Sequence, residues 1–146
     1  MRNCLIKRTL DPSSDKLAAL LADLGKRELL WTDYGLRSLS TTSSIYMQYN
    51  TEHDAPYWRG PIWVNLNYMV LRGLHHYAHV VEGPHQAAAL DLYSRLRDNL
   101  IDNIYRQYQT TGFLWENYNP DTGVGQGCHP FSGWTTLVVL VMAEVY

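Results

Sequence analysis

Four stretches of the chain have the residue pattern of a helix. Residues 13–24 carry helix signals at both ends, because Ser13 or Ser14 can cap the start and Gly25 can stop the helix. Residues 84–109 place apolar side chains at helical spacing, with charged side chains on the opposite side. The apolar side comprises Ala89, Tyr93, Leu96, Leu100, Ile104 and Tyr108. This second pattern predicts an amphipathic helix with one solvated face.

Residues 61–82 and 134–144 predict two helices that are apolar on most sides. Pro61 suits the first helical position, and Gly83-Pro84 suits the end of the first of these helices. Long polar loops precede both, at residues 31–60 and 112–133, and no stretch has the period of a strand. Enclosed and exposed helices therefore alternate along the chain. This order is typical of a double-layered α/α barrel or of another two-layer helical stack, and it indicates an all-α fold.

Composition narrows the class of protein. The chain has 146 residues, of which 46% are hydrophobic and 18% charged, so it can bury a core as one domain. The net charge of −2 argues against an electrostatic nucleic-acid partner. No apolar run approaches the ~20 residues of a membrane span, so we expect no membrane segment in this chain. Five Trp and eleven Tyr favour a wet, aromatic-lined cleft, since both residues combine a flat apolar face with a polar group.

Two segments carry the strongest candidates for chemistry. Tyr57, Trp58, Arg59 and Trp63 gather aromatic rings and a planar cation at the entrance of an apolar helix. Such rings stack on sugar C–H groups, and Arg donates to hydroxyls or carboxylates. The alternative is a helix start covered by packed aromatic residues. In the second segment Glu116 follows Trp115 in a glycine-rich loop, where it serves either as an acid–base group or as a loop carboxylate that accepts backbone hydrogen bonds.

Other residues offer weaker signals. Phe131 and Trp134 flank a loop that closes onto the start of the last helix, where Ser132 can act as a cap. Arg37 follows a glycine turn and either pairs with a carboxylate or touches a ligand. His75 and His79 share a helix face, but the chain shows no evident third ligand, so we predict no metal site. Cys4 and Cys128 form no metal motif and no disulfide framework.

Several uncommon motifs then occur in one order: YGLRSLS, YWRGPIWVNLNY, LRGLHHYA, LWENYNPDTGVGQGCHPFSGW and TTLVVLVMAE. Over residues 29–146 this order resembles the C-terminal end of the processing α-glucosidase I family, the mannosyl-oligosaccharide glucosidases of glycoside hydrolase family sixty-three. The resemblance implies an (α/α)6 toroid, of which residues 1–146 would be a C-terminal fragment with about four helices. It also implies an enzyme of the endoplasmic reticulum lumen that needs no cofactor and that, at full length, is anchored in the membrane by an N-terminal helix, which we do not find in this chain.

The activity that the resemblance implies is removal of the terminal α-1,2-linked glucose from the N-glycan precursor, with inversion. Glu116 matches the general base of the family, and Trp58 and Arg59 match a sugar-binding element. Tyr57, Trp63, Trp115, Phe131 and Trp134 are further candidates for substrate contact. The general acid of the family is an Asp in a Gly-Leu-Asp-Asp-Tyr-type motif, which this chain lacks, so we expect it to be inactive alone. The alternative function is a helical module that binds oligosaccharide without catalysis.

Overall fold

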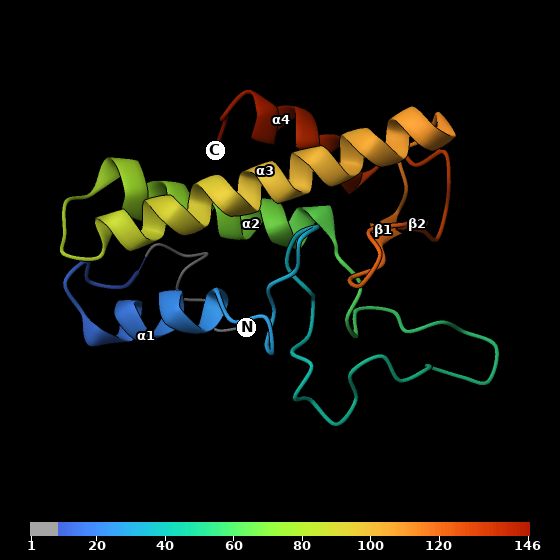
Figure 1. Ribbon diagram of the computed structural model, residues 1–146, viewed down its shortest axis with the longest axis horizontal. Coiled ribbons are helices and arrows are strands. Elements are labelled where there is room, and N and C mark those ends of the chain that lie inside the picture. The colour runs from blue at the N-terminus through green and yellow to red at the C-terminus, as the bar shows by residue number, and fades with distance from the viewer. Residues whose placement is uncertain (1–8) are drawn as a thin grey trace.

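The computed structural model describes residues 9–146 and is mostly helical, as predicted (Figure 1). Its α-helices are α1 (Asp15–Leu24), α2 (Val64–His75), α3 (Gln86–Thr111) and α4 (Val138–Met142). A π-helical turn η1 (His76–Val80) continues α2, and a 3-10 helix η2 (Trp134–Leu137) leads into α4. Two short strands, β1 (Asn117–Tyr118) and β2 (Gly125–Gln126), pair antiparallel within a loop that we predicted to contain no strand.

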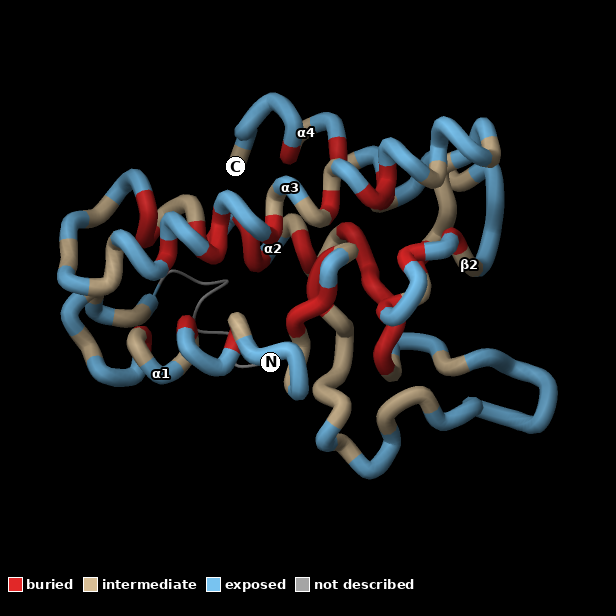
Figure 2. The backbone as a smooth tube through the Cα atoms, in the orientation of Figure 1, coloured by how far each residue is buried: buried red, intermediate tan, exposed pale blue. Residues whose placement is uncertain are grey.

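The centre of the molecule is an antiparallel hairpin of α2–η1 and α3. In Figure 1, α4 covers one side of this hairpin and α1 lies along the other. Figure 2 shows buried residues along the parts of α2 and α3 that face each other. Leu71, Leu74, Leu96 and Leu100 have no exposed surface there. Burial of such side chains contributes roughly 1.5–3 kcal/mol each, so packing against neighbours holds the helices in place.

Helix α1 confirms its predicted ends. The Ser14 hydroxyl caps the helix by accepting from the N–H of Leu17, and Gly25 follows the last turn. Leu17, Leu21 and Leu24 recur at helical spacing and are buried. This single apolar face is why α1 lies on the surface of the hairpin.

The helix predicted from Pro61 begins three residues later. Ile62 is instead held in extended backbone, where it forms bridges with both Arg37 and Tyr118. Trp63 takes the N-cap position without a side-chain cap, and α2 starts at Val64. The expectation that this helix is enclosed on most sides holds only in part, because Met69 is 40% exposed.

Helix α3 was predicted at nearly its observed place. It ends where Gly112 adopts a left-handed conformation with φ of 76°, which glycine allows at little cost. Six of its positions have buried apolar side chains that face the core. The prediction that Tyr108 belongs to this face was wrong, because Tyr108 is 51% exposed. Tyr108 lies in the last turns of α3, near the helix end.

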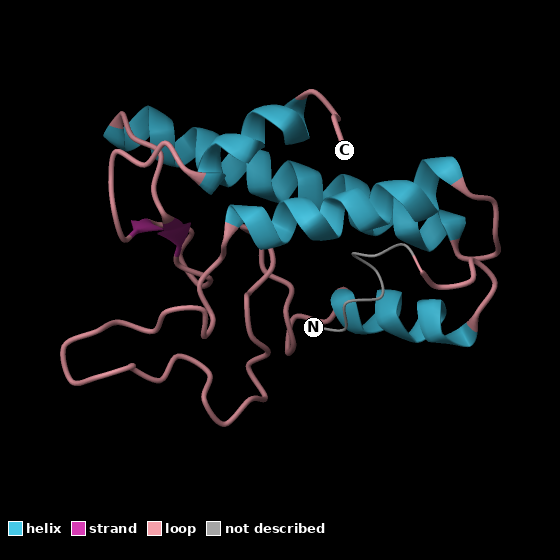
Figure 3. Ribbon diagram, turned by 180° about the vertical axis from the view of Figure 1, so that it is seen from behind, coloured by secondary structure: helices cyan, strands magenta, loops and turns pink. Residues whose placement is uncertain are grey.

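Both long polar segments lie near the N-terminal end of α2, as the view from behind shows (Figure 3). Residues 32–60 form turns and bends, and residues 112–133 contain only β1 and β2. The loops therefore carry the candidate chemistry to one end of a helical scaffold. In residues 9–146, every helix is too short or too polar to pass through a lipid bilayer.

Candidate active site

Glu116 lies in the polar segment of residues 112–133, and its side chain is hydrogen-bonded to both polar segments. The Tyr57 hydroxyl donates to Oε1 of Glu116 at 2.6 Å, and the backbone N–H of Cys128 donates to Oε2 at 3.1 Å. Residues 59 and 12 positions away in the sequence thus bind different oxygens of one carboxylate. The two donors therefore fix the direction in which the carboxylate points.

The main chain of Glu116 is fixed as well. Its N–H donates to the carbonyl of Cys128 at 3.0 Å, and its carbonyl accepts from the indole N–H of Trp134 at 2.8 Å. A Cβ atom at Gly127 would lie 2.5 Å from Oε2 of Glu116, so this position has room only for glycine. Four hydrogen bonds therefore restrict the position of the carboxylate, which is a requirement for acid–base chemistry.

The contact also changes the acidity of Tyr57. The hydrogen bond to Glu116, burial and the charge of the carboxylate together raise the pKa of Tyr57 to about 12. A tyrosinate beside a carboxylate would lose this hydrogen bond and face a like charge. Tyr57 consequently remains a hydrogen-bond donor at physiological pH.

Five of the six aromatic candidates, all except Trp115, meet in one cluster beside Glu116. Trp58 stacks on Trp63 with ring centroids 3.8 Å apart, and Tyr57 meets Trp63 edge-on at 4.7 Å. Trp134 lies 5.5 Å from Trp63, and Phe131 lies 4.9 Å from Trp134. Residues from three segments therefore form a single wall next to the carboxylate.

Only part of this wall can meet a ligand. Trp58 is 39% exposed and Tyr57 is 42% exposed, whereas Trp63 has no exposed surface. Direct substrate contact by Trp63 does not fit this burial, because Trp58 covers its face. Trp63 acts here as the support on which Trp58 and Tyr57 pack.

Trp115 is in close contact with Gly125 and His129. A Cβ atom at Gly125 would lie 2.1 Å from Cγ of Trp115, so the ring rests directly on the backbone of β2. The imidazole of His129 lies on the ring at 3.9 Å, and the indole N–H donates to Thr111. These contacts fix the ring of Trp115, which is half-buried, and its predicted contact with substrate stays a prediction.

Trp58 has an unusual backbone conformation. Its φ of 60° is left-handed, which is an outlier for a bulky residue. Such conformations cost of the order of 1–3 kcal/mol and occur preferentially at ligand sites. Its neighbour Arg59 is half-buried, with its guanidinium 3.5 Å from the carbonyl of Tyr49. This guanidinium is the planar cation that the sequence analysis selected as a candidate for sugar binding.

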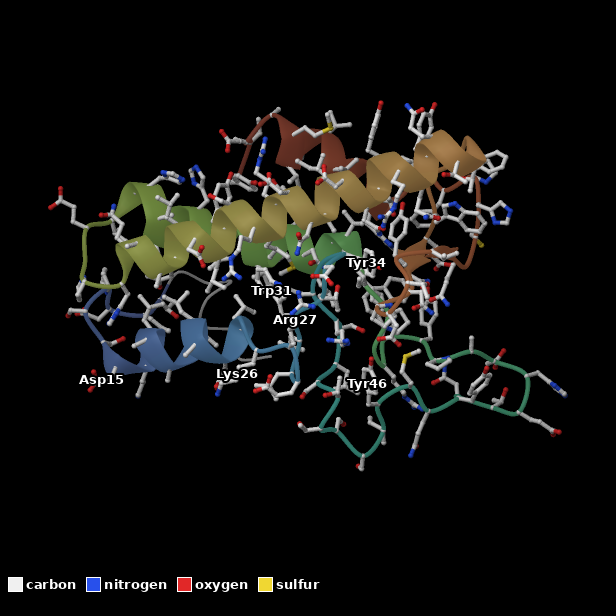
Figure 4. The ribbon with its side chains drawn as sticks, in the orientation of Figure 1. Asp15, Lys26, Arg27, Trp31, Tyr34 and Tyr46 are labelled. Carbon is white, nitrogen blue, oxygen red and sulfur yellow. The ribbon has the colours of Figure 1, made fainter. Side chains whose placement is uncertain are left out.

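Arg37 resolves the alternatives left open by the sequence. Its guanidinium donates to the carbonyl of Trp31 at 2.8 Å and to the hydroxyl of Tyr46 at 3.1 Å, and it pairs with Asp121 at 3.4 Å. Trp31 lies near the end of α1 and Tyr46 lies further out in the loop segment, as Figure 4 shows. Arg37 thus connects separate loop segments and pairs with a carboxylate.

Two acidic side chains of the loop segment, Asp33 and Asp54, are poor candidates for a general acid that would act with Glu116. Asp33 is hydrogen-bonded to Arg27, which lowers the pKa of its carboxyl. A general acid must instead hold a proton near neutral pH. Asp54 is exposed and accepts from the hydroxyl of Thr51. Neither residue has the environment of a general acid.

The histidine pair shows no metal site. The rings of His75 and His79 lie 4.7 Å apart and pack with Tyr93. Within residues 9–146, no three His, Cys, Asp or Glu side chains form a group able to hold a metal ion. Cys128 is exposed with a free thiol, and Cys4 lies outside the described residues.

Sequence reasoning missed two supports of the site. Asn67 is buried, accepts from the N–H of Leu36 at 2.7 Å, and donates to the carbonyls of Leu36 and Trp63. Thr135 is also buried and donates to the carbonyl of Trp115 at 2.6 Å. The available signal was a polar residue inside an apolar helix, which indicates a buried hydrogen-bonding role.

Comparison with known proteins shows the family to which the chain belongs. Residues 3–144 match the glycosyl hydrolase family 63 C-terminal domain. Because the match spans nearly the whole chain, the chain belongs to this family of glycoside hydrolases. The predicted resemblance to the mannosyl-oligosaccharide glucosidases is thereby confirmed.

Individual relatives are similar over almost all of the chain. It is 49% identical to mannosyl-oligosaccharide glucosidase GCS1 of Arabidopsis thaliana over 141 residues, which are 97% of this chain and 16% of that protein. It is 48% identical to alpha-glucosidase 2 of the same plant, over 95% of this chain and 18% of that protein. The chain therefore spans less than a fifth of the length of these relatives.

A solved structure has a similar fold. The GH63 mannosylglycerate hydrolase of Thermus thermophilus in complex with glucose superposes with a TM-score of 0.64 and 30% identity. The match covers 95% of this chain and 29% of that chain. The helical scaffold with its loops is thus a recurring part of larger hydrolases in this family.

Proposed function

We propose that the chain supplies the general-base part of an inverting α-glucosidase site. The observation that carries the proposal is the position of Glu116, fixed by four hydrogen bonds at the edge of the aromatic wall. In this role Glu116 takes a proton from a water molecule as that water attacks the anomeric carbon. The exposed ring of Trp58 and the guanidinium of Arg59 bind the sugar on one side.

The general acid in this proposal lies outside the described residues. In an inverting glycosidase the two carboxyl groups lie roughly 6.5–9.5 Å apart, which leaves room for the water. The (α/α)6 toroid completes the wall opposite Glu116 and carries the acid. The helices and loops of residues 9–146 are then one sector of that toroid.

The proposed substrate is a glucosylated oligosaccharide, the N-glycan precursor with its terminal α-1,2-linked glucose. Support comes from identities of 49% and 48% to two plant glucosidases, compared with 32% to the mannosylglycerate hydrolase of Thermus thermophilus. The corresponding place of action is the lumen of the endoplasmic reticulum.

The test measures glucose released from an α-1,2-glucosyl oligosaccharide. The enzyme is the longest polypeptide encoded by the gene that carries this sequence, and the chain of 146 residues is assayed beside it. We expect β-glucose as the first product of the longer polypeptide, and a fall of about 10²–10⁴-fold in the Glu116→Gln variant. Normal turnover by this variant, or robust turnover by the chain alone, would contradict the proposal.

A further inference from the structure

Tyr57 and Cys128 divide the two oxygens of Glu116 between them. One donor is a side-chain hydroxyl at 2.6 Å from Oε1, and the other is a backbone N–H at 3.1 Å from Oε2. A carboxylate has about four lone-pair sites, so one site on each oxygen stays open. The arrangement leaves the carboxylate able to accept a proton while both donors remain in place.

The side chain of Glu116 is held by neutral donors. None of the ion pairs formed within residues 9–146 involves Glu116. The titratable groups around it are the hydroxyl of Tyr57, the thiol of Cys128 and the imidazole of His129, which stacks on Trp115. The two hydrogen bonds are therefore the contacts that fix the carboxylate of Glu116.

The ring of Tyr57 is itself held in place. It packs edge-on against Trp63 at 4.7 Å and against Trp58 at 5.7 Å. Trp63 is fully buried, so the ring has a rigid neighbour. The hydroxyl of Tyr57 therefore reaches Glu116 from a fixed direction, although its ring lies at the surface.

We propose that Tyr57 is a positioning residue for the general base, which goes beyond the substrate contact expected from the sequence and rests on the proposed function. Its hydroxyl fixes Oε1 of Glu116, so that an open lone pair of this carboxylate can receive the proton of the attacking water. In the reaction the water O–H bond breaks, the proton goes to Glu116, and the water oxygen bonds to the anomeric carbon. The glycosidic oxygen leaves with its bonding electron pair and takes a proton from the general acid, while Tyr57 keeps its own proton.

The first experiment tests the contact without using activity. Tyrosine labelled with ¹³C at Cζ is titrated by NMR in the longest polypeptide that carries this sequence, and the resonance missing from Tyr57→Phe identifies Tyr57. We expect the pKa of Tyr57 to be about 12, and to fall toward its ordinary value of about 10 in Glu116→Gln. A Tyr57 titration that Glu116→Gln leaves unchanged would overturn the proposal.

The second experiment tests the role in turnover. Tyr57→Phe keeps the ring and removes the donor, so we expect kcat to fall roughly 10- to 100-fold with KM nearly unchanged. The loss should fall on kcat and not on KM, because the variant keeps the ring beside Trp63 and loses only the donor that fixes Oε1 of Glu116. A rise in KM with kcat unchanged would contradict the positioning role, as would normal turnover.

The control is Tyr108→Phe, the same substitution at an exposed position on α3. This variant should retain both kcat and KM. The outcomes separate the two proposals. An inactive Glu116→Gln together with an unaffected Tyr57→Phe refutes only the role of Tyr57, whereas an active Glu116→Gln refutes the function assigned to Glu116.

Discussion

Ile62 and Tyr118 exchange two backbone hydrogen bonds, 2.8 Å from the N–H of Ile62 to the carbonyl of Tyr118 and 3.0 Å in the reverse direction. Both residues have no exposed surface. The bridge joins the segment that carries Tyr57 to the segment that carries Glu116. Buried main-chain pairing therefore sets the distance across which the side chains of the site meet.

Replacing Asn67 with Ala should destabilise this junction strongly. The amide of Asn67 satisfies both the N–H and the carbonyl of Leu36 and also reaches the carbonyl of Trp63. Unsatisfied buried polar groups cost about 1–3 kcal/mol each, so the free energy of unfolding should fall by roughly 2–4 kcal/mol. Urea denaturation measures this change.

The matched control for Asn67 is Asn65→Ala in the same helix. Asn65 is partly exposed, and its side chain accepts only from the neighbouring N–H of Leu66. Its loss should cost no more than about 0.5 kcal/mol. Equal costs for the two variants would show that the contacts of Asn67 with Leu36 and Trp63 are not what stabilises the fold.

Gly125→Ala should displace Trp115. A Cβ atom at this position would lie 2.1 Å from Cγ of the indole, and the indole also packs against His129, which restricts its movement. We expect a loss of about 1–3 kcal/mol in the free energy of unfolding, as in other overpacked sites. A changed tryptophan fluorescence spectrum should accompany this loss, since Trp115 leaves its partners.

Gly112→Ala separates crowding from backbone conformation. Gly112 has φ of 76°, but no atom lies within 4 Å of a Cβ placed there. Its substitution should cost only about 1 kcal/mol, the price of a left-handed alanine. The fluorescence of this variant should match that of the parent chain, and a shift as large as that of Gly125→Ala would argue against crowding as the cause.

Trp134→Phe should slow turnover without abolishing binding. The variant loses the indole N–H that donates to the carbonyl of Glu116, while an aromatic ring remains beside Phe131 and Trp63. We expect a fall in kcat of roughly 3- to 10-fold, as for the loss of one neutral hydrogen bond. Steady-state assays of glucose release give this value, and an unchanged kcat would show that the carbonyl contact is dispensable.

Tyr118 should make stability sensitive to alkaline pH. Burial raises the pKa of Tyr118 to about 12 in the folded protein, compared with about 10 in the unfolded chain. The unfolded chain therefore loses its proton first, and the stabilisation present below pH 10 is lost as pH rises toward 12. The loss attributable to this group is on the order of 1–3 kcal/mol.

Comparison with Tyr118→Phe isolates that contribution. The variant has no proton to lose at this position, so its free energy of unfolding should fall less between pH 10 and pH 12 than that of the parent. Tyr108→Phe, at an exposed position, should follow the parent curve. Identical pH dependence in all three proteins would exclude Tyr118 as the source.

The sequence predicted those elements whose ends depend on local chemistry. Ser14 and Gly25 determine the ends of α1, and Gly112 determines the end of α3. The start of α2 was misplaced because Ile62 forms bridges with Arg37 and Tyr118, which are 25 and 56 positions away. A local signal such as Pro61 cannot report a partner at that separation.

For the candidate site, too, the sequence predicted the residues that form motifs but not the contacts that depend on distant partners. Glu116, Tyr57, Trp58 and Trp134 were all selected from motifs, and the structure brings them together. Residue type alone could not show that Trp63 is covered or that Trp115 rests on Gly125. The donor N–H of Cys128 was also invisible, because every residue except proline has one.

The outer part of the loop segment, residues 47–56, projects away from the helices (Figure 1). At its base the N–H of Met47 donates to the carbonyl of Arg59 at 2.7 Å, and Asn50 and Asp54 make the turn nearer its tip. None of the hydrogen bonds that hold Glu116 involves residues 47–56. Substitutions at this tip should therefore leave the hydrogen bonds of Glu116 intact.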